Sequence, residues 1–254
     1  MNKYSLKYLK ILLEENHRKY NCVKFIETDP IQIPHRFSRK EDIEISAFLT
    51  SIIAWGLRSI IIKNSNRLMQ LMDNSPYDFI INSNESDLKT FNNFKHRTFN
   101  EIDCIYFIHS LKNIYKNHAG LQEVFFSKYK ENNRIDEAII NFRNIFFELP
   151  HLNRTEKHIG NISKKSAVKK INMFLRWMVR KDNYGVDFGL WNNISTSDLY
   201  LPLDVHSARV SRQLGLLTRK FDDWQAVIEV TENLKKFDPA DPVKYDFALF
   251  GMDL

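Results

Sequence analysis

Helical periodicity recurs along most of the chain and is the feature that most limits its fold. Apolar residues return at three- or four-residue spacing in the segments 6–13, 43–55, 102–115 and 135–149. Alternating runs of Val, Ile and Thr bounded by turns, which would predict strands, are sparse. The prolines expected at helix boundaries are Pro30, Pro34, Pro76, Pro150 and Pro202. We therefore expect an all-α protein of roughly ten helices.

The chain is long enough to bury a sizeable core. It has 254 residues, of which 43% are hydrophobic, and only seven glycines. We expect one all-α unit over 1–254, arranged as two lobes. No GxGxxG or GxxxxGK pattern is present, so a glycine-rich phosphate loop is excluded.

Several polar residues stand where helix caps are expected. Ser38 or Asp42 is predicted to cap the helix that contains the apolar segment 43–55. Asp222 or Asp223 is predicted to cap a helix near the C-terminus, and Asp241 to cap another whose first residue is the following proline.

The sequence also disfavours a metal-binding protein, a disulfide-rich protein and a membrane protein. Two cysteines cannot form a disulfide framework, and no HxxxH or CxxC spacing occurs. The aspartates Asp238, Asp241, Asp246 and Asp253 invite a metal-binding interpretation, but two of them precede proline and are typical of caps. We expect no metal and no cofactor. The most apolar run, 48–62, is too short for a bilayer and contains an arginine. We expect a cytoplasmic protein without membrane contact.

Positive charge is concentrated in one segment. Residues 154–181 hold nine basic side chains and one acid, a net charge of +8, whereas the whole chain has +6. The rest of the chain is therefore slightly negative. Such a band favours contact with a polyanion, and a solvated helix face is the alternative.

The centre of this band, 163–180, is predicted to form an amphipathic helix. One face holds Lys165, Lys169, Asn172, Met173, Arg176 and Arg180, and the opposite face is apolar. Ser163 or Ser166 would cap its N-terminus, where the helix dipole and the adjacent Lys164 and Lys165 favour a phosphate.

Lys169 lies in the middle of the basic face. Neighbouring positive charges and partial burial disfavour an ammonium ion, so we expect its pKa to be lowered. A partly neutral lysine can act as a nucleophile and form a Schiff base. The alternatives are a phosphate contact or a fully solvated side chain.

Asp204 begins a second unusual segment, 199–217, in which an extended approach ending at Pro202 is followed by helical spacing. The aspartate is a good N-cap and its carboxylate need do nothing else. In a cleft, the same carboxylate would stabilise a sugar oxocarbenium ion or accept a proton.

Residues 202–210, Pro-Leu-Asp-Val-His-Ser-Ala-Arg-Val, and the following Arg-Gln-Leu-Gly-Leu resemble the segment around the catalytic aspartate of helix-hairpin-helix DNA glycosylases. The resemblance implies that Asp204 is the catalytic aspartate, with His206 and Arg209 on the next helix near DNA. Valine stands at 205, where the family typically has threonine.

The segment Lys169-Lys170-Ile171 to Met173-Phe174 is similar to the lysine-bearing helix of archaeal 8-oxoguanine glycosylases, a branch of the same superfamily. This similarity implies that Lys169 is the Schiff-base lysine, with Lys170 as the alternative register. The hairpin segment Leu-Pro-Gly-Val-Gly of the superfamily is absent, and a longer link, 149–166, stands in its place. The segment 149–217 thus combines a divergent hairpin, the basic helix and the aspartate. No iron–sulfur cluster is implied.

The chain also resembles, over its whole length, a bacterial protein family without an assigned activity. The shared blocks are 174–180, 186–191 and 241–249. This second resemblance implies no chemistry.

The glycosylase resemblance implies a DNA-repair enzyme that removes a damaged base from double-stranded DNA, and it leaves open a lyase activity that then cleaves the strand. The residues expected to contact DNA are Lys164, Lys165, Lys170, Arg176, Arg180, His206 and Arg209. Trp191 is the candidate to stack on an extruded base, with core packing as the alternative. We infer no obligate protein partner, and we expect association with the nucleoid. A non-catalytic nucleic-acid-binding protein on the same fold, or a scaffold for an acidic protein, are the other hypotheses.

Overall fold

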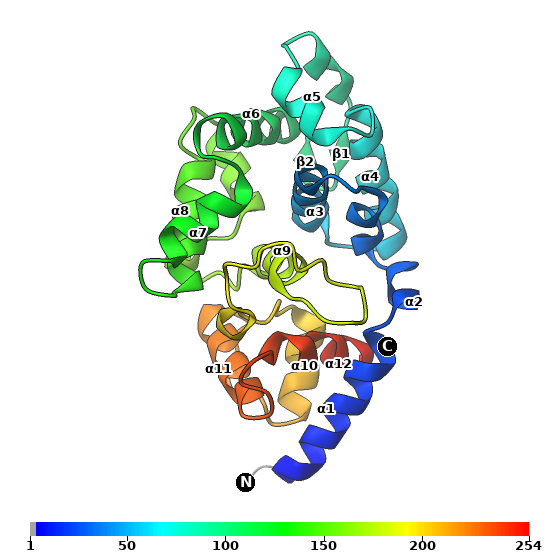
Figure 1. Cartoon of the computed structure of the whole chain (residues 1–254), viewed down its shortest axis with the longest axis vertical. Helices are drawn as coiled ribbons and strands as arrows, with labels where there is room; N and C mark the ends of the chain where they lie inside the picture. Colours follow the sequence, from blue (N-terminus) through cyan, green and yellow to red (C-terminus); the bar gives the residue numbers. More distant parts are fainter. Residues whose placement is uncertain (1–3, 254) are drawn as a thin grey trace. The chain divides into compact units, whose positions relative to one another are not determined.

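The structure is a computed structural model that describes residues 4–253. Helices dominate this part of the chain, which confirms the all-α prediction. Its only strands, β1 (Lys95–His96) and β2 (Phe99–Asn100), form a short antiparallel pair. The chain divides into two compact units, and the colours in Figure 1 follow the sequence through both of them. We call Thr28–Ile159 the central unit, and Met1–Glu27 with Gly160–Leu254 the terminal unit.

The central unit holds six α-helices in its described residues. They are α3 (Lys40–Ile53), α4 (Arg58–Leu71), α5 (Pro76–Asn82), α6 (Glu101–Asn117), α7 (Leu121–Tyr129) and α8 (Ile135–Phe146). Its short 3-10 helices are η1 (Pro30–Gln32), η2 (Pro34–Arg36), η3 (Asp87–Phe91) and η4 (Asn153–His158).

The core of the central unit is built around α3, in which every residue from Ile43 to Ile53 is buried. Phe48 of this helix stacks on Phe107 and meets the edges of Phe142 and Phe146. Large rings that meet edge to face bury much apolar area and add specific geometry. Aromatic packing therefore holds the helices of this unit together.

The terminal unit holds the remaining described α-helices. They are α1 (Leu6–Tyr20), α2 (Val23–Ile26), α9 (Lys169–Val179), α10 (Val205–Gln213), α11 (Trp224–Lys235) and α12 (Asp246–Gly251). Its 3-10 helices are η5 (Ile162–Lys164), η6 (Thr196–Asp198) and η7 (Pro242–Tyr245).

In the terminal unit, α1 runs along α12, and α10 also packs on α12 (Figure 1). The contact between α1 and α12 is close at Gly251, where an added Cβ would lie 2.0 Å from the ring of Tyr20. α9 buries the predicted apolar face, including Ile171, Phe174 and Met178. This helix therefore forms part of the interior of the unit.

The capping predictions had mixed outcomes. Asp223 caps α11 by accepting a hydrogen bond from the Ala226 amide, and Asp241 precedes η7 with a proline at its start, as predicted. The prediction for Ser38 or Asp42 was wrong, because the cap position of α3 is Arg39. The carboxylate of Asp42 instead accepts from the Tyr77 amide at 2.8 Å.

The predicted helix over 163–180 is shorter in the structure, where α9 begins only at Lys169. Residues before it form η5 and a turn, and the boundary between the two units falls between 159 and 160. The predicted hairpin-like segment 149–217 is thus divided between the units.

Candidate functional site

The N-terminus of α9 is fixed by an unusual backbone conformation. Val168, the cap position, has φ of +42°, in the left-handed region that β-branched residues rarely adopt. Such a conformation costs on the order of 1–3 kcal/mol and persists only where the surroundings impose it. Here the side chain of Val168 is buried, and its amide donates to Oγ of Ser166 at 3.3 Å. The turn places Lys169 as the first residue of the helix.

Asp204 is the N-cap of α10, as its sequence context predicts. Its Oδ1 accepts hydrogen bonds from the amides of His206 and Ser207, each at 3.0 Å. Oγ of Ser207 accepts from the Asp204 amide at 2.9 Å and completes a capping box. These bonds fix the plane of the carboxylate, because one of its oxygens is held by two backbone donors.

The second oxygen of this carboxylate faces Lys169. Nζ of Lys169 lies 3.8 Å from Oδ2 of Asp204. The side chains are 27% and 32% exposed, respectively, so solvent still reaches both. The structure thus brings together the two residues that sequence analysis assigned to catalysis, 35 positions apart in the chain.

Lys170 differs from its neighbour in environment. Burial and, after it, the charge of Lys169 lower the pKa of Lys170 to about 7. At neutral pH a substantial fraction of its amine is therefore uncharged. The two adjacent lysines consequently offer one amine paired with a carboxylate and one amine that is readily deprotonated.

Asp246, the first residue of α12, adds a buried carboxylate to this region. It pairs with Arg176 of α9. Burial raises the pKa of Asp246 to about 6, Arg176 opposes this shift, and the charge of Asp204 adds to it. Lys169, Asp204, Asp246 and Arg176 are therefore electrostatically linked. The sequence did not predict this role for Asp246.

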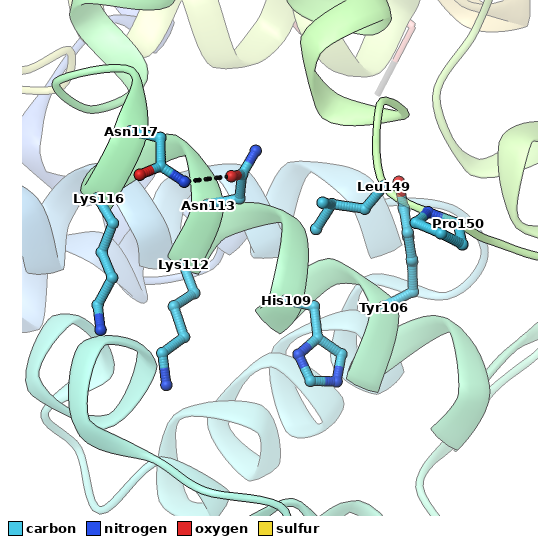
Figure 2. A pocket seen from close by; sticks show the side chains of 8 residues that line it. All are labelled: Tyr106, His109, Lys112, Asn113, Lys116, Asn117, Leu149 and Pro150. Carbon is cyan, nitrogen blue, oxygen red and sulfur yellow. Dashed lines mark hydrogen bonds between the residues drawn. The ribbon is translucent and has the colours of Figure 1, made fainter.

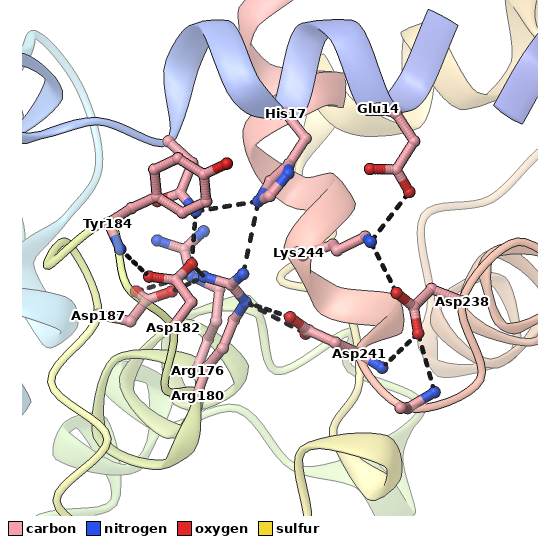
Figure 3. Close-up of polar contacts among 12 residues, drawn as sticks. Glu14, His17, Arg176, Arg180, Asp182, Tyr184, Asp187, Asp238, Asp241 and Lys244 are labelled. Carbon is pink, nitrogen blue, oxygen red and sulfur yellow. Dashed lines mark hydrogen bonds and ion pairs between the residues drawn. The ribbon is translucent and has the colours of Figure 1, made fainter. Parts of the chain in front are cut away.

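The last turn of α9 lies in a buried ionic network, shown in Figure 3. Arg180 pairs through Nη1 with Asp187 at 3.0 Å and Asp182 at 2.8 Å, and through Nε with Asp241 at 2.9 Å. Arg176 also reaches Asp187, at 3.3 Å. Buried charges persist in proteins when they are paired and hydrogen-bonded in this way.

His17 of α1 borders the same network. It lies 2.9 Å from Nδ2 of Asn21 and 3.5 Å from Nη2 of Arg180 (Figure 3). Burial and the charge of Arg180 lower the pKa of His17 to about 4. His17 is therefore neutral at physiological pH.

The prediction of an exposed basic face through Arg176 and Arg180 was wrong. These side chains are 4% and 1% exposed, respectively, and their guanidinium groups are occupied by carboxylates. A DNA phosphate has no access to an arginine in this position. Helical spacing indicated which residues share a face, but it could not show that acids from other segments cover that face.

The prediction that Trp191 stacks on an extruded base was also wrong for this structure. Trp191 is fully buried, and its ring meets Phe174 edge to face at 5.3 Å between centroids. A base cannot approach a ring that is enclosed by the core. Trp191 instead packs in the core, which was the alternative interpretation.

The other predicted DNA contacts lie nearer the solvent. Lys164 and Lys165 are exposed, and Lys170 is partly buried. His206 and Arg209 are also exposed, and both reach the carboxylate of Asp253 on the neighbouring turn after α12. Positive charge accessible to a polyanion is therefore concentrated before α9 and along α10.

A separate pocket lies along α6 in the central unit (Figure 2). It has a volume of about 410 Å³, and its lining includes Tyr106, His109 and Lys112. Nζ of Lys112 already donates to the Ser83 carbonyl at 2.6 Å. The residues that line the pocket include no carboxylate. The acid nearest to its basic groups, Glu85, lies 3.8 Å from His109 but does not line the pocket. The pocket is therefore a weaker candidate than Lys169 and Asp204.

Within residues 4–253, no group of three His, Cys, Asp or Glu side chains is arranged to hold a metal ion. None of the helices in that range combines the length and apolarity needed to cross a bilayer.

The chain belongs to a family described as "Protein of unknown function (DUF2400)", which matches residues 29–254. No curated protein and no solved structure matches the chain.

Proposed function

Because this family supplies no activity, we propose from the geometry of the site that the protein is a DNA N-glycosylase. Lys169 is its nucleophile, and the covalent intermediate allows a lyase step. The observation that carries the proposal is the 3.8 Å approach of Lys169 Nζ to Asp204 Oδ2. The resemblance of 202–210 to the aspartate segment of helix-hairpin-helix glycosylases supports it. The site would act on a damaged nucleotide of double-stranded chromosomal DNA in the cytoplasm.

In the proposed reaction, the ammonium group of Lys169 first loses a proton to solvent, and the resulting amine attacks C1′ of the damaged nucleotide. The C1′–N bond breaks, its electron pair leaves with the base, and the base takes up a proton. The carboxylate of Asp204 stabilises the positive charge that develops on the sugar. The amine loses a proton as the sugar ring opens to a Schiff base. Elimination of the 3′-phosphate from that intermediate would be the lyase step.

The local structure suits these roles. Two backbone amides hold Oδ1 of Asp204, so that Oδ2 keeps its orientation toward Lys169 while the sugar is bound. Catalytic groups held in place before the substrate arrives need little reorganisation during the reaction. The partial exposure of both side chains leaves a route for the sugar.

DNA would be held by the exposed basic residues of the terminal unit. In this proposal Lys164 and Lys165 neutralise phosphates just before the N-terminus of α9, and His206 and Arg209 do so from α10. Lys170, the lysine with the lowered pKa, is the competing nucleophile.

Trapping with borohydride tests the proposal. The protein is incubated with duplexes that carry a panel of damaged bases or an abasic site, and the covalent adduct and the released base are measured. We expect an adduct with the wild type, its loss in Lys169→Gln, and at least a hundredfold slower base release in Asp204→Asn. Lys181→Gln, an exposed lysine beyond the same helix, is the matched control and should behave as the wild type.

Two outcomes would change the proposal. An adduct that survives Lys169→Gln but disappears in Lys170→Gln would move the nucleophile by one residue. Absence of both adduct and base release with every substrate would overturn the enzymatic function.

The burial of Trp191 favours one alternative, a non-catalytic nucleic-acid-binding protein, because it removes the aromatic ring assigned to hold a base. This alternative predicts salt-sensitive duplex binding that persists in Asp204→Asn, with no product formed by any variant.

A further inference from the structure

Two segments that are far apart in the sequence lie side by side in the terminal unit. Ser166, in the turn before α9, forms a β-bridge with Asp223, at the start of α11. The amide of Trp224 also donates to the carbonyl of Lys165 at 3.0 Å. These backbone contacts bring Lys164 and Lys165 next to the loop 218–223.

The carboxylates in this region are already engaged. Asp223 forms two hydrogen bonds with the Arg219 guanidinium, and Asp222 pairs with Arg212. Glu229 accepts from the amide and the hydroxyl of Thr218, each at 2.6 Å. The local acids therefore do not serve as counter-ions for the lysines of the same surface.

Lys164, Lys165 and Lys220 are exposed, and within residues 4–253 no carboxylate lies at ion-pair distance from them. A surface with three unpaired ammonium groups and neutralised acids is positive, and it attracts anions from solution.

The most prominent apolar side chain of this surface is Phe221, which is 72% exposed. It lines a shallow hollow of about 550 Å³ together with Thr218, Arg219, Lys220, Gln225, Ile228 and Glu229. The hollow thus combines two apolar side chains, Phe221 and Ile228, with the unpaired cation of Lys220, and its one carboxylate, Glu229, is held by Thr218.

We propose that Phe221, Lys220, Lys164 and Lys165 form a binding patch for single-stranded DNA. The ring of Phe221 offers a flat apolar face to an unpaired base, and the lysines lie where the flanking phosphates would be. In a duplex the base faces are covered by stacking, so only the phosphate contacts would remain. This patch uses neither Lys169 nor Asp204, and it goes beyond the proposed reaction.

Fluorescence anisotropy with a labelled 12-nucleotide single strand, and with a duplex of the same length, tests this patch across a salt series. Phe221→Ala should weaken single-strand binding about tenfold and leave duplex binding nearly unchanged. The double variant Lys164→Gln/Lys165→Gln should lower the salt dependence of single-strand binding by about 1.4 in log–log slope.

The controls are exposed residues of α1. Tyr8→Ala removes another exposed aromatic ring, and Lys7→Gln/Lys10→Gln removes two exposed lysines. Neither should change binding. The thermal midpoint of Phe221→Ala should equal that of the wild type, because the ring makes little contact with the core.

Single-strand binding that is insensitive to Phe221→Ala would overturn the patch. So would equal affinity for a poly-glutamate peptide of matched charge, since that would indicate an acidic protein partner. The outcome is separable from the proposed reaction: Lys169→Gln should keep single-strand binding, and Phe221→Ala should keep the trapped adduct on a duplex. Either proposal can fail while the other stands.

Discussion

The two ends of α9 use the same kind of charge in different ways. In the first turn, Lys169 is partly exposed and faces a single carboxylate, Asp204. In the last turn, Arg180 is enclosed and shared among Asp182, Asp187 and Asp241. The comparison shows that a basic residue on a helix is available for chemistry or for structure according to the acids that other segments bring to it.

The largest expected effect is a loss of stability when the buried arginine at the C-terminal end of α9 is replaced. Arg180→Met leaves three carboxylates without their buried cation, and we expect it to lower the free energy of unfolding by about 3–5 kcal/mol. Chemical denaturation followed by circular dichroism measures this loss. Arg209→Met, which removes an exposed arginine paired with Asp253, should cost less than about 1 kcal/mol. Equal effects of the two substitutions would contradict the structural role of the buried network.

A smaller effect depends on pH. His17 has a pKa of about 4 when folded and an ordinary value near 6.5 when unfolded, so the unfolded chain binds the extra proton between these values. Stability from this residue is therefore present above pH 6.5 and is lost as the pH falls toward 4, by up to about 3 kcal/mol. His17→Gln should lack this loss, so the difference in unfolding free energy from the wild type should change across that range.

Asp246 is expected to change the free energy of unfolding with pH in the opposite direction, which Asp246→Asn tests. The folded pKa of Asp246 is about 6, above its ordinary value of 3.8, so the folded state binds the proton first. Its contribution to stability falls as the pH rises from about 4 to 6. For each variant, the difference in unfolding free energy from the wild type is plotted against pH. Equal slopes for His17→Gln and Asp246→Asn would show that the network is not arranged as described.

The smallest expected effect concerns the cap at Asp204. Asp204→Ala removes the acceptor of the His206 and Ser207 amides, and it should lower stability by about 1 kcal/mol. Asp204→Asn keeps an acceptor oxygen, so its cost should be smaller although base release is lost. Thermal unfolding of both variants, beside the trapping assay, separates the structural role of Asp204 from its proposed catalytic role.

Local interactions explain which features the sequence predicted correctly. The cap at Asp204 depends on amides two and three residues away, and the apolar face of α9 depends on spacing within one helix. Both are visible in a short stretch of sequence. The contact between Lys169 and Asp204 was expected from a family resemblance, since no local pattern connects residues that are 35 positions apart.

Features that depend on distant segments were not predictable in the same way. Asp246, which pairs with Arg176, lies 70 positions later in the chain, and no local rule joins them. Trp191 was the candidate to stack on an extruded base, but Phe174 and the surrounding core enclose it. The start of α9 was missed because Val168 adopts a backbone conformation that its residue type disfavours.

The two-unit arrangement has a consequence for how the protein is made. All of the central unit lies within 28–159, so a growing chain can complete it early. The terminal unit must wait, because Glu14 of α1 pairs with Tyr245, 231 positions later, and Tyr20 packs on Gly251. A ribosome therefore has to add 231 residues after Glu14 before this contact of α1 can form. Lys169 and Asp204 would become a stable pair only at that moment, so a partly synthesised chain would carry a finished central unit and no finished site.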